Sequence, residues 1–150
     1  MFIAFEGGEG SGKSTQARRL SHRLQHLSLP VILVHEPGAT PLGQRLKRLL
    51  KEGPPLSAEA ELLLFAAARA ELVSEVILPA LESQKVVITD RFADSTLAYQ
   101  GYGRGLDLNL IKTVNDFATH GLKPDLVMLL DIEPEVGLQR KTGHDRLERE

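Results

Sequence analysis

Short apolar runs alternate with longer segments of helical periodicity along the chain. The apolar runs cover residues 2–5, 31–34, 86–89 and 126–130, and each is continuously apolar instead of alternating with polar positions. Continuously apolar strands are typical of a parallel sheet that helices cover on both faces. The alternation of strands and helices therefore predicts a doubly wound α/β fold with a parallel sheet.

Apolar residues at helical spacing predict four main helices, over residues 13–27, 42–52, 58–81 and 108–120. Ser57 and Asp107 precede two of these helices and are expected to cap them. Pro79 is expected to kink or shorten the long third helix, and Pro134 suits the first turn of a short last helix. Phe117 is expected on the buried face of the fourth helix. A flexible turn before that helix is predicted from three glycines, Gly101, Gly103 and Gly105.

Composition narrows the classes of function. The 18 basic and 20 acidic residues give a net charge of −2, which argues against an electrostatic nucleic-acid binder. The absence of cysteine excludes disulfides, thiolate zinc sites and cysteine nucleophiles. No apolar run reaches the ~18 residues of a membrane span, and no basic region precedes the first apolar run. We therefore expect 150 residues to form one cytoplasmic domain with no membrane or nucleic-acid partner.

The strongest chemical signal follows the first predicted strand. Residues 7–14 read GGEGSGKS and fit G-x-x-x-x-G-K-[ST], a phosphate-binding loop between a strand and a helix. Backbone N–H groups of such a loop converge on phosphate oxygens, and the helix N-terminus adds positive charge. Lys13 is expected at the β- and γ-phosphates, and the Ser14 hydroxyl at Mg²⁺. The expected ATP-binding residues are Gly7, Gly8, Glu9, Gly10, Ser11, Gly12, Lys13, Ser14 and Thr15.

Acidic residues follow two of the predicted strands. Asp90 and Asp131 come where ligands bind in open α/β sheets, so both are candidates for the neighbourhood of Mg²⁺. We expect Asp90 to serve the metal together with Ser14; a helix cap or a solvated turn acid is the alternative for both acids. Residues 122–125 read LKPD and lack the Asn or Thr of a guanine-reading segment, which argues against a GTPase.

Cationic and aromatic residues suggest a second, anionic substrate. Arg91 follows Asp90 directly and is suited to hold phosphate oxygens bidentately; an ion pair with Asp90 or Glu36 is the alternative. Phe65 and Arg69 are four residues apart and share one helix face, where they could stack on a base and bond its carbonyl. Packing in the core is the alternative for Phe65.

These motifs together resemble the thymidylate kinase family, and the resemblance covers the whole chain. They are the P-loop with Glu9 at its third position, residues 36–43 (EPGATPLG), Phe65 with Arg69, residues 90–92 (DRF) and residues 95–101 (STLAYQG). The family phosphorylates dTMP to dTDP with ATP and Mg²⁺. The resemblance implies a P-loop NTPase fold with strand order 2-3-1-4-5, of which four strands are expected here, and a homodimer.

The resemblance also implies roles for individual residues. Glu9 matches the acid that holds the sugar 3′-hydroxyl, and Phe65 matches the ring stacked on thymine. Arg69 matches the group that bonds the thymine carbonyl, and Arg91 matches the arginine that bridges the two phosphates. Lys13, Glu9 and Arg91 are thus expected to be catalytic. The other implied dTMP contacts are Glu36, Pro37, Lys47, Ser95, Thr96, Tyr99 and Gln100.

Position 10 carries glycine where some family members carry a catalytic arginine, so the chain resembles members that use a mobile lid. The lid is expected over residues 139–150, with Arg140 and Arg146 as catalytic residues and Lys141 as a further candidate. A solvated helix face of mixed charge is the alternative. Because family members are longer, we expect the chain to be C-terminally incomplete. The rival functions are another nucleotide or nucleoside kinase and a nucleotide-binding module without catalysis.

Overall fold

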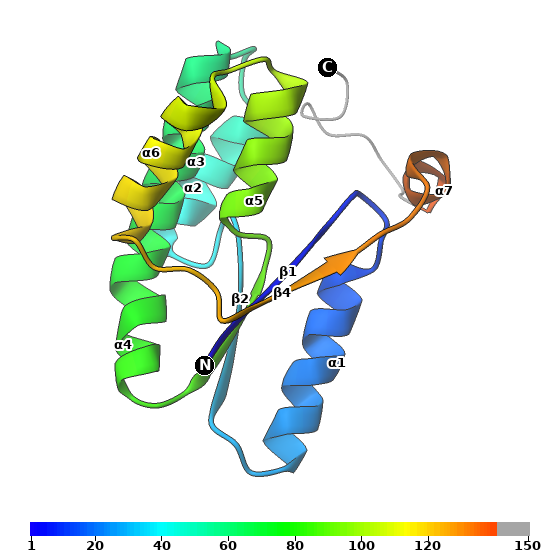
Figure 1. The fold of residues 1–150 in the computed structure, drawn as a ribbon, viewed down its shortest axis with the longest axis vertical. Coiled ribbons are helices and arrows are strands. Elements are labelled where there is room, and N and C mark those ends of the chain that lie inside the picture. Colours follow the sequence, from blue (N-terminus) through cyan, green and yellow to red (C-terminus); the bar gives the residue numbers. More distant parts are fainter. Residues whose placement is uncertain (141–150) are drawn as a thin grey trace.

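Four parallel strands form the central sheet of the molecule. The computed structural model describes residues 1–140. In it, β1 pairs with β3 and β4, and β2 pairs with β3, which gives the strand order β2-β3-β1-β4. This order matches the first four positions of the expected 2-3-1-4-5 sheet, so the predicted fold class is confirmed (Figure 1). The strands are β1 (Phe2–Gly7), β2 (Val31–His35), β3 (Val86–Asp90) and β4 (Leu126–Leu130).

The expected helices are present, and both expected caps form. Ser57 Oγ accepts a hydrogen bond from the Ala60 N–H at 3.2 Å, and Asp107 Oδ1 accepts one from the Leu110 N–H at 2.8 Å. These bonds satisfy backbone donors that the first helical turn leaves unpaired. The helices are α1 (Lys13–His26), α2 (Pro41–Glu52), α3 (Ala58–Leu72), α4 (Leu78–Glu82), α5 (Ala93–Thr96), α6 (Leu108–Thr119) and α7 (Pro134–Gln139).

The long helix predicted to run from residue 58 to residue 81 continues through Pro79 without ending. A π-helical segment, η1 (Val73–Ile77), joins α3 to α4 just before the proline. Pro79 has no N–H to donate and its ring crowds the preceding turn, and a wide turn is one of the ways in which a helix absorbs such a residue. The proline therefore interrupts the regular helix without shortening it.

The flexible turn expected from three glycines is wrong. Gly101 and Gly103 belong to a second π-helical segment, η2 (Leu97–Gly103), which continues α5. Gly101 is buried, and a Cβ there would stand 2.5 Å from the Leu108 side chain. This glycine thus serves close packing against α6, and Gly105, with φ +75°, is the member of the trio in a loop with the left-handed conformation.

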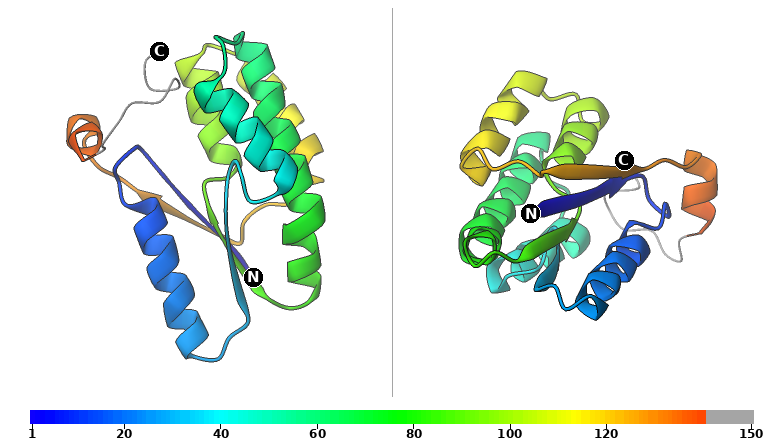
Figure 2. Two further views of the ribbon diagram at one scale, coloured as in Figure 1. Left: turned by 180° about the vertical axis from the view of Figure 1, so that it is seen from behind. Right: turned by 60° about the horizontal axis from the view of Figure 1, so that its bottom comes forward.

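Helices cover both faces of the inner strands, as expected. Phe2 and Ala4 pack on one face with residues of α3, η1 and α4, whereas Ile3 and Phe5 pack on the other face against Ala17 of α1. Successive side chains of a strand point to opposite faces, which divides β1 between the two cores. Figure 2 shows α1 on one side of the sheet, and α3, α4 and α6 on the other.

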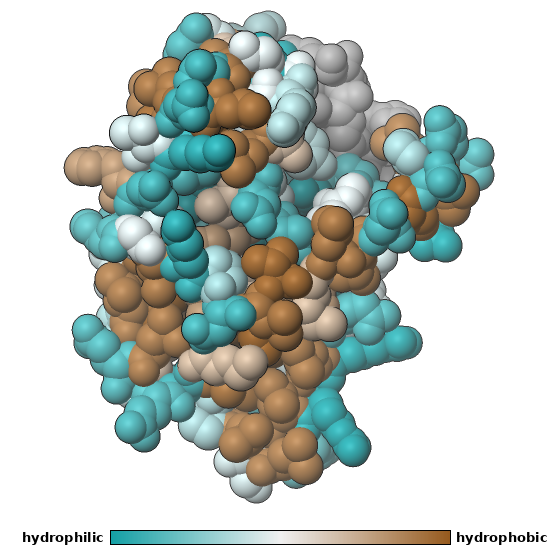
Figure 3. All heavy atoms as spheres, viewed as in Figure 1, coloured by the Kyte–Doolittle hydropathy of each residue, from teal (hydrophilic) through white to brown (hydrophobic). Residues whose placement is uncertain are grey.

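The edge strand and α6 depart from expectation. Leu129 of β4 is 72% exposed, and apolar side chains gather along this strand in Figure 3. Phe117, expected on a buried face, is 85% exposed, because the buried positions of α6 are Ile111, Asn115, Ala118 and Thr119. Among the described residues, no helix is long and apolar enough to cross a membrane.

Candidate active site

The glycine-rich loop after β1 folds around the ammonium group of Lys13. Lys13 is 6% exposed, and its Nζ donates to the Gly8 carbonyl at 2.6 Å and to Ser11 Oγ at 3.5 Å. Burial lowers the pKa of Lys13 by disfavouring its charged form, and the charge of Arg91 acts in the same direction. The first helical turn and this lysine together form a cationic, donor-rich cradle of the kind that binds phosphate.

Oxygen ligands for a divalent cation lie beside this lysine. Ser14 Oγ donates a hydrogen bond to Asp90 Oδ2, so the start of α1 meets the carboxyl end of β3. Within residues 1–140, no cluster of three or more acids or histidines could hold a metal by itself. Mg²⁺ commonly takes one or two protein oxygens and completes its shell with water and substrate phosphates. The pair of Ser14 and Asp90 fits that requirement.

The last described helix packs directly on the phosphate loop. A Cβ at Gly10 would overlap the carbonyl of Gly137, and a Cβ at Gly137 would overlap the carbonyl of Glu9. Gly10 also has φ +67°, a conformation that glycine adopts without strain. Arg140 follows this helix, and its Nη1 donates to the Gly10 carbonyl at 3.4 Å. The α7 helix thereby brings one cation of the expected lid to the loop.

Arg91 turns its guanidinium towards the loop glutamate. Its Nη2 forms an ion pair with Glu9 Oε1 and lies 3.3 Å from the Tyr99 hydroxyl, and its Nη1 donates to Ser95 Oγ at 3.3 Å. The guanidinium carbon also lies 5.2 Å from the centroid of the Tyr99 ring. Arg91 has φ 72°, an uncommon conformation for a residue with a side chain, and such conformations cluster at functional sites. Its partner is Glu9, not Asp90 or Glu36.

Arg69 lies at the bottom of the pocket in a network of four acceptors. It is 1% exposed; its Nε donates to Glu36 at 2.9 Å, and its Nη1 donates to Asn115 at 2.6 Å. Its Nη2 donates to Thr96 Oγ1 at 2.8 Å and to the Phe92 carbonyl at 3.2 Å. A guanidinium has five N–H donors, so one remains beyond these four hydrogen bonds. The network makes Arg69 structural as well as a candidate for base recognition.

Two glutamates are buried beside this network, and burial raises the pKa of both. Desolvation raises the pKa of Glu36, and the nearby charge of Arg69 opposes the rise. Among buried side-chain atoms of the described residues, Glu36 Oε1 has no hydrogen-bond partner. Desolvation also raises the pKa of Glu6, which accepts from Ser95 Oγ at 2.6 Å and from the Phe92 N–H at 2.7 Å. Glu6 thereby fixes the segment that follows Arg91.

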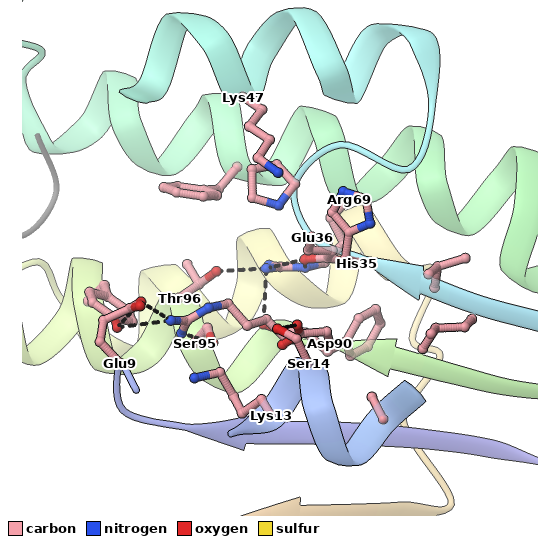
Figure 4. Close-up of a pocket in the computed structure, with 18 of the residues that line it drawn as sticks. Glu9, Lys13, Ser14, His35, Glu36, Lys47, Arg69, Asp90, Ser95 and Thr96 are labelled. Carbon is pink, nitrogen blue, oxygen red and sulfur yellow. Dashed lines mark hydrogen bonds and ion pairs between the residues drawn. The ribbon is translucent and has the colours of Figure 1, made fainter. Parts of the chain in front are cut away.

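One pocket of about 790 Å³ collects most of the residues expected from the sequence. Figure 4 shows Lys13 and Ser14 on one side of it and Lys47 on the opposite side. Gly7, Gly8 and Ser11 belong to the loop but not to the pocket wall, and Asp131 is also outside the wall. Lys141 and Arg146 lie outside the described residues. The expected residues on the wall are Glu9, Gly10, Gly12, Lys13, Ser14, Thr15, Glu36, Pro37, Lys47, Phe65, Arg69, Asp90, Arg91, Ser95, Thr96, Tyr99, Gln100 and Arg140.

The family model and the relatives that match this chain belong to one protein family. The family model described as thymidylate kinase matches residues 5–150. Thymidylate kinase of Synechococcus sp. (strain JA-2-3B'a(2-13)) is 57% identical over 150 residues, which cover 100% of this chain and 73% of the relative. The chain belongs to the thymidylate kinase family. Thymidylate kinase of Halothermothrix orenii is 52% identical over 157 residues, covering 100% of this chain and 76% of that relative.

A solved structure of the thymidylate kinase family supports the fold. The crystal structure of thymidylate kinase from Ehrlichia chaffeensis matches with a TM-score of 0.85 at 41% identity. The match covers 93% of this chain and 81% of the other. The P-loop NTPase fold predicted from the sequence is thus confirmed by an experimentally determined relative.

Several wall and support residues of this family member are not among those expected from the sequence. Arg18, one helical turn after Ser14, and Lys51 line the pocket. Glu6 and Asn115 bind pocket residues from beneath. For Glu6 and Asn115, a polar residue within an otherwise apolar strand or helix face was a signal in the sequence. A buried polar group needs a hydrogen-bond partner, so such a residue indicates a contact with another polar group.

Proposed function

We propose that this pocket transfers the γ-phosphoryl group of ATP to the 5′-phosphate of dTMP, giving ADP and dTDP. One observation carries the proposal: groups suited to phosphate and groups suited to a base line the same cleft. Lys13 and Arg91 provide fixed positive charge, and Phe65 and Gln100 provide a ring and an amide. Thymidylate kinase relatives, one of them 57% identical over the whole chain, support this substrate pair.

The donor nucleotide is assigned to the glycine-rich loop. Lys13 would neutralise the β- and γ-phosphates, and Arg140 beside Gly10 would approach the same phosphates from α7. Mg²⁺ would be held by Ser14 directly and by Asp90 directly or through water, and when bound it neutralises charge on the phosphate oxygens. Arg146 and Lys141 remain predicted lid residues.

The acceptor nucleotide is assigned to the opposite part of the cleft. Phe65 would stack on thymine, while the remaining N–H of Arg69 and the amide of Gln100 would bond the base edge. Glu9 would hold the sugar 3′-hydroxyl. The residues assigned to the sugar and phosphate of dTMP, on the resemblance, are Glu36, Pro37, Lys47, Ser95, Thr96 and Tyr99.

Catalysis in this arrangement consists of positioning and charge neutralisation. An oxygen of the dTMP phosphate attacks the γ-phosphorus, and the bond from that phosphorus to the bridging oxygen of ADP breaks. No covalent intermediate on the protein is needed. Arg91 would contact both the attacking and the transferred phosphate, where repulsion between the two nucleotides is greatest. Its bonds to Glu9, Ser95 and Tyr99 hold the guanidinium in place.

A homodimer is the proposed assembly. The helices α2, α3 and α6 pack side by side, and their outer surface carries exposed apolar residues, among them Leu63 at 60% and Phe117 at 85% exposure. Exposed apolar patches of this kind commonly mark protein–protein contacts. The family resemblance makes a second copy of the chain the occupant. A cytoplasmic location also stays a prediction, made from the sequence and not from the resemblance.

The test measures ADP formation from ATP and Mg²⁺ with dTMP, dUMP, dCMP, dGMP or no acceptor. We expect dTMP to give the highest kcat/KM and Lys13→Met to abolish turnover. Arg19→Met, on the exposed side of the same helix, serves as the matched charge control. A clear preference for another monophosphate would instead indicate a different nucleotide kinase. ATP binding without dTMP-dependent ADP release would indicate a binding module.

A further inference from the structure

A buried charged cluster lies behind the base end of the pocket, and the proposed function does not use it. Glu61 of α3 is 1% exposed, and its Oε1 accepts from Gln100 Nε2 at 2.7 Å. Arg104 forms an ion pair with Glu61, with its Nη2 2.9 Å from Oε2 and its Nε 3.4 Å from Oε1. Gln100 is 2% exposed and lines the pocket, so it connects this cluster to the site of the base.

The chemistry of the cluster determines which end of the Gln100 amide faces Glu61. An ionised carboxylate accepts hydrogen bonds and donates none, whereas an amide has one donor end and one acceptor end. Glu61 is paired with the cation of Arg104, so Gln100 must turn its NH₂ towards Glu61. The polar atom that Gln100 can then offer to the pocket is Oε1, a hydrogen-bond acceptor.

We propose that Glu61, anchored by Arg104, is a positioning residue that sets base specificity by fixing the amide of Gln100. This proposal rests on the proposed function, which places the base at this end of the pocket. Thymine presents a ring N3–H donor, which an acceptor at Gln100 complements. Cytosine presents a bare N3 acceptor, which would face Gln100 Oε1 without a hydrogen between them. An unpaired polar contact of this kind discriminates more strongly than a missing apolar contact.

Replacing the carboxylate by an amide of the same shape should release this constraint. In Glu61→Gln, Arg104 still requires an acceptor, and its shorter bond is to the Oε2 position. The new amide therefore places its oxygen there and its NH₂ at the Oε1 position, towards Gln100. The oxygen of Gln100 would then face the new amide at position 61, and its NH₂ would face the pocket. There the NH₂ can donate a hydrogen bond to N3 of cytosine.

Equilibrium binding measures this effect without depending on turnover. Calorimetric titration would give the Kd of dTMP and of dCMP for the wild type, Glu61→Gln, Glu61→Asp and Glu59→Gln. In Glu61→Gln we expect dTMP to bind about 10-fold more weakly and the ratio of the two Kd values to fall by about 10-fold or more. Glu61→Asp keeps a carboxylate and should keep the ratio within about threefold. Glu59→Gln makes the same charge change at an exposed residue of the same helix and should leave both Kd values unchanged.

The outcomes separate the two proposals. A wild type that discriminates strongly, together with a Glu61→Gln variant that discriminates equally well, overturns the positioning role and leaves the proposed function intact. A wild type that binds dCMP as tightly as dTMP overturns the base assignment and the positioning role together. Thermal unfolding checks that each variant is folded. If Glu61→Gln fails that check, the double variant Glu61→Met with Arg104→Met removes the acceptor and its cation together, which is commonly tolerated for a buried ion pair. Without the carboxylate the amide of Gln100 is free to turn, so the ratio should fall in the same direction.

Discussion

The buried ion pair beneath the pocket leads to a quantitative prediction about stability. The side chains of Arg69 and Glu36 are 2% and 4% exposed, and Arg69 Nη2 lies 2.8 Å from Glu36 Oε2. Arg69→Met keeps an unbranched apolar chain in place but leaves Glu36 without a counter-charge. Removing one partner of a buried pair costs about 3–5 kcal/mol, a large part of the ~5–15 kcal/mol that stabilises a domain.

A second substitution tests whether the unpaired charge causes this loss. Adding Glu36→Gln to Arg69→Met removes the charge and keeps the shape, so the double variant should recover about 2 kcal/mol of the free energy of unfolding. If lost packing of the arginine were the cause instead, the double variant would be no more stable than the single one.

The same pair predicts a pH dependence with a definite sign. Burial raises the pKa of Glu36 above its usual value, and Arg69 limits the rise. An acid whose pKa is higher in the folded state than in the unfolded state adds to the free energy of unfolding. This contribution is complete at pH values below the unfolded-state pKa, and it is lost as the pH rises through the folded-state pKa. Without Arg69 the pKa of Glu36 should rise further. The free energy of unfolding of Arg69→Met should therefore fall with increasing pH, by up to about 1.4 kcal/mol per pH unit.

Urea unfolding of the wild type, both variants and Arg19→Met between about pH 5 and pH 8 measures these differences. Arg19 is exposed on α1, so its substitution should change the free energy of unfolding by less than about 0.5 kcal/mol. A loss below about 1 kcal/mol in Arg69→Met, with a pH dependence parallel to that of the wild type, would show that Arg69 does not stabilise the buried charge of Glu36.

Four further variants test other parts of the site and the assembly. Arg91→Ala should lower kcat by about 10³-fold or more in steady-state kinetics, and near-normal turnover would exclude a role in charge stabilisation. Ser14→Ala should raise the Mg²⁺ concentration needed for half-maximal activity, and an unchanged titration would remove this hydroxyl from the metal site. Gly137→Ala would overlap the Glu9 carbonyl and push α7 off the loop, so the Kd for ATP should rise about 10-fold while thermal unfolding stays close to wild type; equal Kd values would contradict this contact. Phe117→Glu should yield a monomer in sedimentation experiments, and an intact dimer would place the interface elsewhere.

The sequence predicts the elements that depend on local signals. Residues close together in the sequence determine the strand pattern, the caps at Ser57 and Asp107 and the phosphate loop. Each of these features is present in the structure. Strand order followed only from the family resemblance, because hydrophobic periodicity does not say which strands pair. Ser14 and Asp90 meet because the loop after β1 and the carboxyl end of β3 lie at the same edge of the parallel sheet.

The sequence fails to predict features that depend on contacts between elements far apart in the chain. Gly101 favours a turn by its own preference, but its lack of a side chain allows α6 to approach η2, so the segment is helical. On α6, the buried positions Ile111 and Ala118 are seven residues apart, and Phe117 points away from that line. The family resemblance places Arg69 at the base, but its four buried acceptors come from three segments far apart in the sequence and have no local pattern.

The proposed reaction moves a phosphoryl group from ATP to dTMP within this pocket. Phosphorus NMR of a mixture of ATP, Mg²⁺, dTMP and the chain follows every phosphate directly. We expect ADP and the two coupled phosphorus signals of dTDP to appear in equal amounts, with no inorganic phosphate. Release of inorganic phosphate without dTDP, or no change in either nucleotide, would contradict it.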